Sequence, residues 1–460
     1  MERIRQAVIL ALGHGVDAAG AGAPAALDPV AGLPLIKRSI LTLARVGVTR
    51  VDVLVGRDGD TIRTALNGDP QYARAGINVG LVDCYDAPSD ATALLGIADR
   101  LTGPFLLLAA DLVFDVTVAR TMAAADLSVV GVHVAVDHQR PDRVAGGLLA
   151  AGRELLDCLA EPGRTTGTGS LADGLVDLAG RGRIREIDVG NQLCDRLDTA
   201  AARTRAESLL LAALTKPTDG WASRHLNRPI SLWVTRRWLL GTAITPNQIT
   251  VFAGVIGFFG IWLVARATWW PVVAGAFLIH VQSVLDGCDG EVARLKFQGS
   301  RLGEWLDNVI DDTMNIFYGL ALGHAVTVIT GEPTYRWLGV ATAVGYAIYN
   351  VVLYMQLWVV HRSGNPFLFR WWFQREDTYL QDEVPGSGLT QRLLAGLHGM
   401  GRRDVFLLAF FLLCAARLPQ VAIAWYAAVA ATSGLMAIVH LLAGGLANDL
   451  RMRAARRTVK

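Results

Sequence analysis

The sequence predicts two fold classes in one chain: an N-terminal α/β, Rossmann-like domain followed by an all-α bundle of six transmembrane helices. Hydrophobic residues make up 52% of the 460 residues, and the mean hydropathy of +0.36 is high for a soluble protein. Apolar runs long enough to cross a bilayer begin only near residue 249. We therefore expect an α/β domain at 1–215, an interfacial amphipathic segment at 216–245, a membrane domain at 246–450 and a basic tail at 451–460.

The N-terminal segment alternates short apolar runs with helical patterns. Strand-like runs occur at 7–13, 50–56, 77–84 and 104–115, with helical patterns between them at 33–47, 60–67 and 91–101. This order predicts a mainly parallel sheet with helices on both faces. Ligands of such sheets bind beyond the carboxyl ends of the strands, where the Gly13–Gly15 turn and Asp111 are expected. Both features have a structural alternative, since a glycine turn can simply join a strand to a helix and an aspartate can cap a helix.

Three stretches of this segment, "ALGHGVD", "GAPAALDPVAGLPLI" and "LCDRLDTAAARTRAE", resemble motifs of the sugar-phosphate nucleotidyltransferase family. Gly32, Pro34 and Leu35 match the family pattern, and Asp111 matches one of its metal-binding aspartates. The resemblance covers about 200 residues and implies the fold of that family for a domain that lies in the cytoplasm.

Three positions depart from the same pattern. The two cations that neutralise the triphosphate in the family fall on Asp17 and Ala25, and Arg196 stands where a motif aspartate is expected. We therefore interpret the site around Gly13, Gly15 and Asp111 as vestigial and inactive in nucleotidyl transfer.

Six apolar runs in the second half are candidate membrane spans, at about 249–265, 269–285, 303–330, 336–360, 404–417 and 421–446. Lys and Arg collect before the first run, in alternate connecting loops and in the tail "RMRAARRTVK". Because basic loops face the cytoplasm, both termini of a multi-pass protein in the cell membrane are expected on that side. The lack of a secretory signal agrees with this orientation. The stretch "SRHLNRPISLWVTRRWLLG" favours a helix in the headgroup layer over a plain linker.

Acidic residues at helical spacing lie between the second and third runs. Asp286 and Asp289 are three residues apart, and Asp307 and Asp311 are four apart, so each pair shares one helix face. Asp312 is off that face and is expected to be solvent-facing. The two antiparallel helices let both pairs meet at the cytoplasmic end of the bundle, where four carboxylates would repel unless a cation lay among them. Oxygen ligands select Mg²⁺ or Mn²⁺.

Small residues and one cation surround these aspartates. Gly287, Gly290, Gly303 and Ala293 leave room for a flat or phosphorylated ligand, and Arg294 adds a positive charge. In the alternative, the glycines serve close helix packing and the arginine reaches the lipid headgroups. A divalent-cation transporter is an alternative from another functional class, although it would place its carboxylates nearer the middle of the membrane.

The joint spacing D-x-x-D-G-x-x-A-R, eight residues, then G-x-x-x-D-x-x-x-D resembles the signature of the CDP-alcohol phosphotransferase family without a departure. The resemblance covers 215–450. It implies transfer of a substituted phosphoryl group from a CDP-alcohol to an acceptor alcohol, with release of CMP, in the synthesis of phospholipids or related polar headgroups. It further implies metal ligands at Asp286, Asp289, Asp307 and Asp311, with Asp311 also the general base. The implied CDP pocket is formed by Gly290, Ala293, Arg294, Gly303 and Asn247.

The acceptor needs a cationic clamp if it carries a phosphate, as inositol phosphate and glycerol phosphate do. Arg301, Arg402 and Arg403 are the candidates. The two-domain arrangement resembles enzymes that make CDP-inositol and join it to inositol phosphate, which implies CDP-inositol as the donor. Because the first site is degenerate, CDP-diacylglycerol made elsewhere is the other expected donor. A bifunctional cytidylyltransferase and phosphotransferase of that kind is the alternative function. A lipid bilayer and a second copy of the chain, as a homodimer, are the expected partners, and nucleic acid is not.

Overall fold

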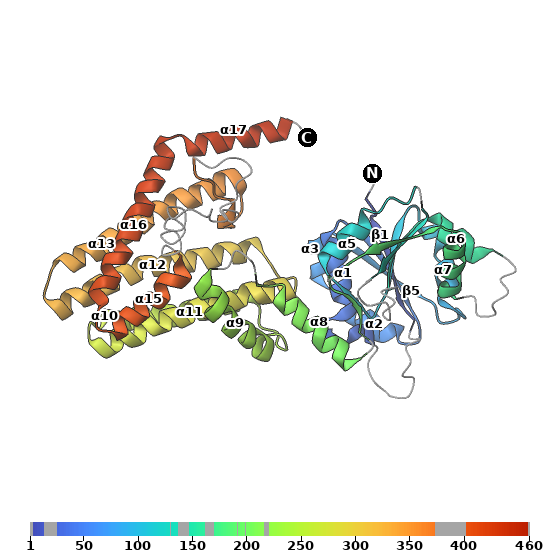
Figure 1. Ribbon diagram of the computed structural model, residues 1–460, viewed down its shortest axis with the longest axis horizontal. Helices are drawn as coiled ribbons and strands as arrows, with labels where there is room; N and C mark the ends of the chain where they lie inside the picture. The colour runs from blue at the N-terminus through green and yellow to red at the C-terminus, as the bar shows by residue number, and fades with distance from the viewer. Residues whose placement is uncertain are drawn as a thin grey trace. The chain divides into compact units, whose positions relative to one another are not determined.

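The structure is a computed structural model (Figure 1) that describes residues 3–12, 25–128, 130–136, 147–161, 170–190, 192–197, 199–215, 220–372 and 402–458. The chain divides into two compact units, residues 1–213 with 295–297 and residues 214–294 with 298–460. The first unit is the α/β part of the chain, and the second is helical.

A seven-stranded sheet forms the centre of the first unit, in the order β10-β8-β9-β6-β1-β4-β5. Only β9 among these strands runs antiparallel to its neighbours, β6 and β8. The strands are β1 (Gln6–Ala11), β4 (Arg50–Val55), β5 (Asn78–Asp83), β6 (Phe105–Ala109), β8 (Val132–Val136), β9 (Leu148–Ala151) and β10 (Ile184–Asp188). The mainly parallel sheet predicted from the alternating pattern is confirmed.

Successive residues of each strand point to opposite faces of the sheet, and helices cover both faces. On β1, Ile9 packs in one buried cluster with side chains of α1 and α5, whereas Val8 packs in another with side chains of α4 and α6. The helices of this unit are α1 (Leu35–Arg45), α2 (Gly59–Leu66), α3 (Pro70–Ala75), α4 (Asp90–Leu95), α5 (Val116–Ala123), α6 (Arg153–Ala160), α7 (Leu171–Gly180) and α8 (Ala200–Ala212).

Two short strand pairs flank the main sheet. β2 (Pro29–Val30) and β3 (Leu33–Pro34) form a hairpin whose turn residues Ala31 and Gly32 both have positive φ, at 46° and 80°. β7 (Leu112–Phe114) pairs antiparallel with β11 (Cys194–Arg196), with Leu112 opposite Arg196. This second pair brings a late segment of the chain beside the end of β6.

The second unit begins with a juxtamembrane helix, defined here as residues 223–239. It consists of α9 (Arg228–Val234) between π-helical turns at Ser223–Asn227 and Thr235–Leu239. The longer helices are α10 (Pro246–Ala265), α11 (Trp269–Leu295), α12 (Arg301–Thr330), α13 (Thr334–Gln356, extended by a π-helical turn to His361), α15 (Arg403–Ala415), α16 (Pro419–Leu442) and α17 (Gly445–Thr458). In Figure 1, α10, α11, α12 and α13 run in roughly one direction, and α16 is drawn at a steeper angle.

Within the described part of the chain, five helices are long and apolar enough to cross a membrane: α10, α11, α12, α13 with its extension, and α16. The predicted count of six spans is not confirmed. The run predicted at 404–417 forms only the 13-residue helix α15. At 1.5 Å per residue this helix spans about 20 Å, less than the roughly 30 Å of a hydrocarbon core.

Glycines let pairs of these helices touch backbone to backbone. A Cβ on Gly260 of α10 would lie 2.8 Å from the carbonyl oxygen of Gly275 of α11. A Cβ on Gly323 of α12 would lie 2.7 Å from the Cα of Gly339 of α13. Close packing of this kind drives helix association in lipid. The hydrophobic effect contributes little there, because moving an apolar side chain from lipid into a helix interface changes its free energy only slightly. The glycine contacts fix α11 and α12, the two helices that carry the predicted aspartates.

Candidate metal and substrate site

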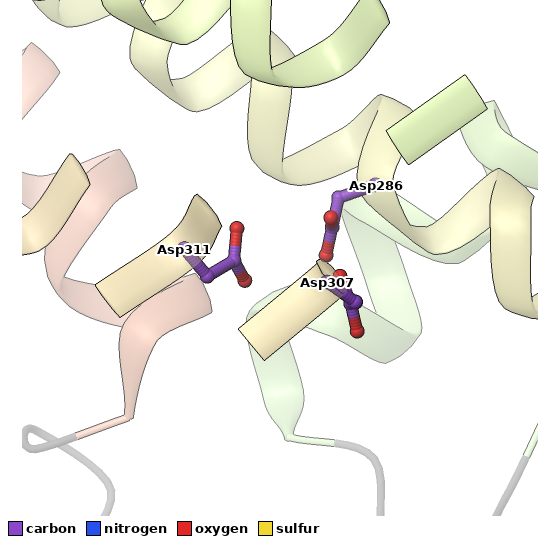
Figure 2. A group of neighbouring side chains, drawn as sticks. All are labelled: Asp286, Asp307 and Asp311. Carbon is purple, nitrogen blue, oxygen red and sulfur yellow. The ribbon is translucent and has the colours of Figure 1, made fainter. Parts of the chain in front are cut away.

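Three carboxylates from two neighbouring helices converge at one end of the bundle. One ligand atom from each of Asp286, Asp307 and Asp311 lies within 4.8 Å of the others, and Figure 2 shows the three side chains directed into a common space. Asp286 comes from α11, and the other two come from α12. Ser300 caps α12 by accepting a hydrogen bond from the Gly303 nitrogen at 3.0 Å, which sets the start of the helix and thereby the face that Asp307 and Asp311 share.

The donor set fits a divalent cation. Asp307 Oδ1 is buried and has no hydrogen-bond partner among the described residues. A buried carboxylate oxygen without a donor is costly, and a hard cation is a partner that such an oxygen can share with the neighbouring carboxylates. Asp286, Asp307 and Asp311 are therefore the residues that would hold the metal.

The fourth predicted metal ligand has a different environment. Asp289 is one helical turn beyond Asp286, but it is not in the group of three carboxylates. Its Oδ2 accepts a hydrogen bond from the hydroxyl of Thr250 on α10. The structure thus brings together three of the four predicted aspartates and ties the fourth to a neighbouring helix.

Asp311 lies in a closed ring of polar contacts. Its Oδ2 pairs with the Arg403 guanidinium of α15, and its Oδ1 accepts a hydrogen bond from Gln282 Nε2 at 3.0 Å. Gln282 Oε1 in turn accepts a hydrogen bond from Arg403 Nη2 at 2.9 Å. Gln282 is fully buried on α11, one turn before Asp286. The proposed general base and one candidate acceptor cation are therefore in direct contact, and Gln282 joins them.

The predicted acceptor cations lie in different places. Arg403 is in the site, whereas Arg402 pairs with Asp404 at 3.4 Å. Arg301 is exposed at the first residue of α12. Of the three, Arg403 alone is described in contact with one of the aspartates.

The predicted nucleotide pocket combines three small residues with the longer polar side chains of Asn247 and Arg294. A Cβ on Gly303 would lie 2.7 Å from Asn247 Oδ1, so the side chain of Asn247 occupies the space that this glycine leaves. A Cβ on Gly290 would lie 3.5 Å from Arg294 Nη1. Ala293 lies half-buried on the same helix. The first contact links the start of α10 to the motif residues of α12, and the second lies within α11.

Glu291, which the sequence did not single out, is the most completely bonded carboxylate near the site. It is fully buried on α11. It accepts hydrogen bonds from Ser231 Oγ at 2.6 Å and Thr235 Oγ1 at 2.7 Å, and it pairs with Arg228 Nη1 at 3.1 Å. All three donors belong to the juxtamembrane helix. Glu291 thus holds that helix onto the motif helix.

Asp312 corrects one expectation. It was expected to face solvent, but its Oδ2 accepts a hydrogen bond from the Tyr354 hydroxyl of α13, and the residue is only partly exposed. Adjacent residues of a helix are about 100° apart, so the residue after Asp311 points towards the next helix of the bundle instead of away from it. The sequence contains no sign of which helix that would be.

The predicted site of the α/β unit is only partly described. Gly13, Gly15 and Asp17 lie outside the described residues. Asp111 follows β6, and its carboxylate accepts hydrogen bonds from Arg196 Nη2 at 2.6 Å and Nε at 3.0 Å. The guanidinium that replaces a motif aspartate therefore binds the aspartate that was expected to hold a metal.

The helices and the carboxylate cluster together define a class of protein. Five helices of membrane length and a polar site at one end of their bundle mark a multi-pass membrane protein with a site suited to a divalent cation. Residues 243–432 match the family described as CDP-alcohol phosphatidyltransferase. This part of the chain is therefore similar to CDP-alcohol phosphatidyltransferases, in agreement with the resemblance of its motif.

Several curated proteins are similar to this chain. A protein of Aquifex aeolicus named "Bifunctional IPC transferase and DIPP synthase" is 33% identical over 147 residues, which are 32% of this chain and 33% of that protein. A protein of the same name from Rubrobacter xylanophilus is 28% identical over 375 residues, 74% of this chain and 82% of that protein. The first match spans only about a third of the relative's length.

Solved structures were also found for the first unit. The inositol-1-phosphate CTP transferase from T. maritima is 16% identical, with a TM-score of 0.35, and the match covers 45% of this chain and 96% of that one. A UDP-glucose pyrophosphorylase bound to UDP-glucose is 15% identical, with a TM-score of 0.36, and covers 45% of this chain and 97% of its own.

Proposed function

We propose that this protein is a metal-dependent CDP-alcohol phosphotransferase of the membrane. It moves a substituted phosphoryl group from a CDP-alcohol to the hydroxyl of an acceptor and releases CMP. The observation that carries the proposal is the convergence of Asp286, Asp307 and Asp311 inside a region similar to CDP-alcohol phosphatidyltransferases, with a buried oxygen of Asp307 left for a cation.

The chain's own residues have distinct roles in this reaction. A bound divalent cation supplies Lewis-acid polarisation and offsets the charge of the diphosphate. Asp286, Asp307 and Asp311 hold that cation, and Asp289, fixed by Thr250, borders the site. Asp311 takes the proton of the acceptor hydroxyl. The oxygen of that hydroxyl then bonds to phosphorus as the bond between phosphorus and CMP breaks. Arg403 is placed to bind an anionic group of the acceptor.

The nucleotide is proposed to lie against the low-bulk residues of the motif. Gly290 and Ala293 leave the space, Arg294 supplies a cation, and Gly303 admits the side-chain amide of Asn247. The backbone of the motif could then approach the diphosphate closely and orient the reacting phosphorus towards the acceptor.

We further propose that the α/β unit does not catalyse nucleotidyl transfer. The Arg196 guanidinium already neutralises Asp111, so that carboxylate is engaged by a fixed charge of this chain. The curated relatives carry bifunctional names, and a second, cytidylyltransferase activity is the competing proposal. Incubation of the whole protein with CTP and inositol phosphate separates the two, because pyrophosphate release that Asp111→Ala removes would establish the second activity.

The donor, the acceptor and the placement of the protein remain part of the proposal. CDP-diacylglycerol and CDP-inositol are the candidate donors, and inositol phosphate and glycerol phosphate are the candidate acceptors. The polar ends of α11 and α12 are proposed to face the cytoplasm, because Lys and Arg collect before α10 and in the connection between α11 and α12. A homodimer is the expected assembly.

A direct assay tests the function. The purified protein in detergent is given each donor with each acceptor in Mg²⁺ or Mn²⁺, and CMP is quantified by chromatography. We expect CMP release from at least one pair, and its loss after chelation of the metal. Release by wild-type protein that Asp307→Asn and Asp311→Asn leave intact would contradict the assigned roles.

A further inference from the structure

Gln282 lies outside the aspartate motif, yet its amide is the only described group bonded to both Asp311 and Arg403. The residue is fully buried. Its neighbour Gly257 on α10 leaves the room it needs, because a Cβ there would lie 3.0 Å from Gln282 Cγ and 2.7 Å from Met314 Sδ. A buried primary amide is retained where both of its ends have partners, since an unpaired end would be costly.

The chemistry of the two partners fixes the orientation of this amide. Asp311, as a carboxylate, can only accept, and Arg403 can only donate. Gln282 Nε2 therefore donates to Asp311 Oδ1 at 3.0 Å, and its Oε1 accepts from Arg403 Nη2 at 2.9 Å. Rotation of the amide by 180° would place like groups against each other at both ends. One residue thus sets the position of a base and a cation relative to each other.

The Arg403 guanidinium also has one N–H group available to bind a ligand. Its Nε is buried and has no hydrogen-bond partner within the described part of the chain. An anionic group entering beside Asp311 would meet this N–H and could share the guanidinium with the carboxylate. An acceptor without such a group would leave the buried N–H unsatisfied.

We propose that Gln282 is a positioning residue that fixes the distance between the Asp311 carboxylate and the Arg403 guanidinium. The site then selects acceptors that carry an anionic group close to the reacting hydroxyl. This inference rests on the proposed function and deepens it. Gln282 itself contacts neither substrate. It acts by keeping the proton-accepting oxygen and the anion-binding guanidinium at a constant separation while the acceptor binds.

Two variants separate the two hydrogen bonds. Gln282→Leu removes both, and we expect kcat to fall and the KM of the acceptor to rise, each roughly 10- to 100-fold, the usual effect of losing a hydrogen bond to a charged group. Gln282→Glu keeps an acceptor for Arg403 but places a carboxylate against Asp311. In this variant kcat should fall by a similar factor while the KM of the acceptor stays near the wild-type value. The KM of the CDP-alcohol should not change in either.

Controls separate positioning from folding and from metal binding. Gln356→Leu removes another buried amide, that of Gln356 on α13, which is hydrogen-bonded to His440 at 2.7 Å. This variant should lower thermal stability but change neither kcat nor the KM of the acceptor selectively. Mn²⁺ binding, followed by electron paramagnetic resonance on the whole protein, should be unchanged in Gln282→Leu. The effects of Gln282→Leu and Arg403→Ala on the KM of the acceptor should be less than additive in the double variant.

The outcomes are distinct. If wild-type protein releases no CMP with any pair of substrates, the proposed function fails and the inference fails with it. If wild-type protein is active but both Gln282 variants show wild-type kinetics, the inference alone is wrong. The same holds if kcat and the KM values of both substrates worsen together as thermal stability falls. Loss of Mn²⁺ binding in Gln282→Leu would likewise overturn it, because Gln282 would then belong to the metal site.

Discussion

Removal of the Glu291 carboxylate should loosen the juxtamembrane helix from the bundle. In Glu291→Ala, Ser231, Thr235 and Arg228 lose their shared acceptor, and the arginine is left as a partly buried charge. Breaking a buried ion pair by removing one partner costs about 3–5 kcal/mol. For a unit of this size each kcal/mol lowers Tm by about 2–4 °C, so the apparent Tm should fall by roughly 6–20 °C.

The assay is thermal unfolding of the purified protein in detergent, in a background in which Cys84, Cys158 and Cys194 are replaced by serine. A thiol-reactive fluorophore then reports the buried cysteines Cys288 and Cys414 as they become exposed. Glu304→Gln is the matched control, because Glu304 is exposed on α12 and its carboxylate accepts a hydrogen bond from Ser363 Oγ at 3.2 Å. This control should shift Tm by less than about 2 °C. An equal shift in the two variants would refute the idea that the buried carboxylate clamps the helix, as would an unchanged Tm in Glu291→Ala.

Three other results are expected. Asp307→Asn should weaken Mn²⁺ binding at least 10-fold and lower CMP release at least 100-fold, because it removes a charge from the cluster; retained binding in a titration would exclude Asp307 as a ligand. Gly303→Ala should abolish activity without unfolding the protein, since its methyl group would lie within 3 Å of Asn247 Oδ1; normal turnover would show that this space is not needed. A cysteine introduced at Ser363 should react with a membrane-impermeant maleimide only from the cytoplasmic side, and labelling of intact cells from outside would reverse the proposed orientation.

Local periodicity accounts for much of what the sequence predicted. The apolar alternation of β1, with Val8 and Ile9 on opposite faces, and the four-residue spacing of Asp307 and Asp311 depend only on the geometry of a strand and of a helix. The fold of the α/β unit and the pairing of α11 with α12 therefore followed from short stretches of sequence. The predicted count of six spans was not confirmed at α15, because the run at 404–417 is itself short and forms a helix of only 13 residues.

Contacts between distant residues could not be predicted in the same way. Glu291 meets Thr235, 56 residues earlier in the chain, and Gln282 meets Arg403, 121 residues later. Neither pair has a periodic signal, because each depends on how whole helices pack. The same reason explains Asp312, whose partner Tyr354 lies on the next helix. A buried glutamate or glutamine inside an apolar run was the one available hint, since such a residue needs a partner wherever it lies.

The glycine contacts between the long helices lie far from the carboxylates they help to place. Gly323, where α12 touches α13, is 12 residues beyond Asp311, which corresponds to about 18 Å along the helix. Such a contact acts as a pivot: a tilt of about 5° there would displace the Asp311 end of α12 by roughly 1.5 Å, a large fraction of a metal–oxygen bond. The geometry of the carboxylate cluster, and with it the proposed affinity for a cation, is thus expected to depend on the close helix contact that Gly323 permits about 18 Å away.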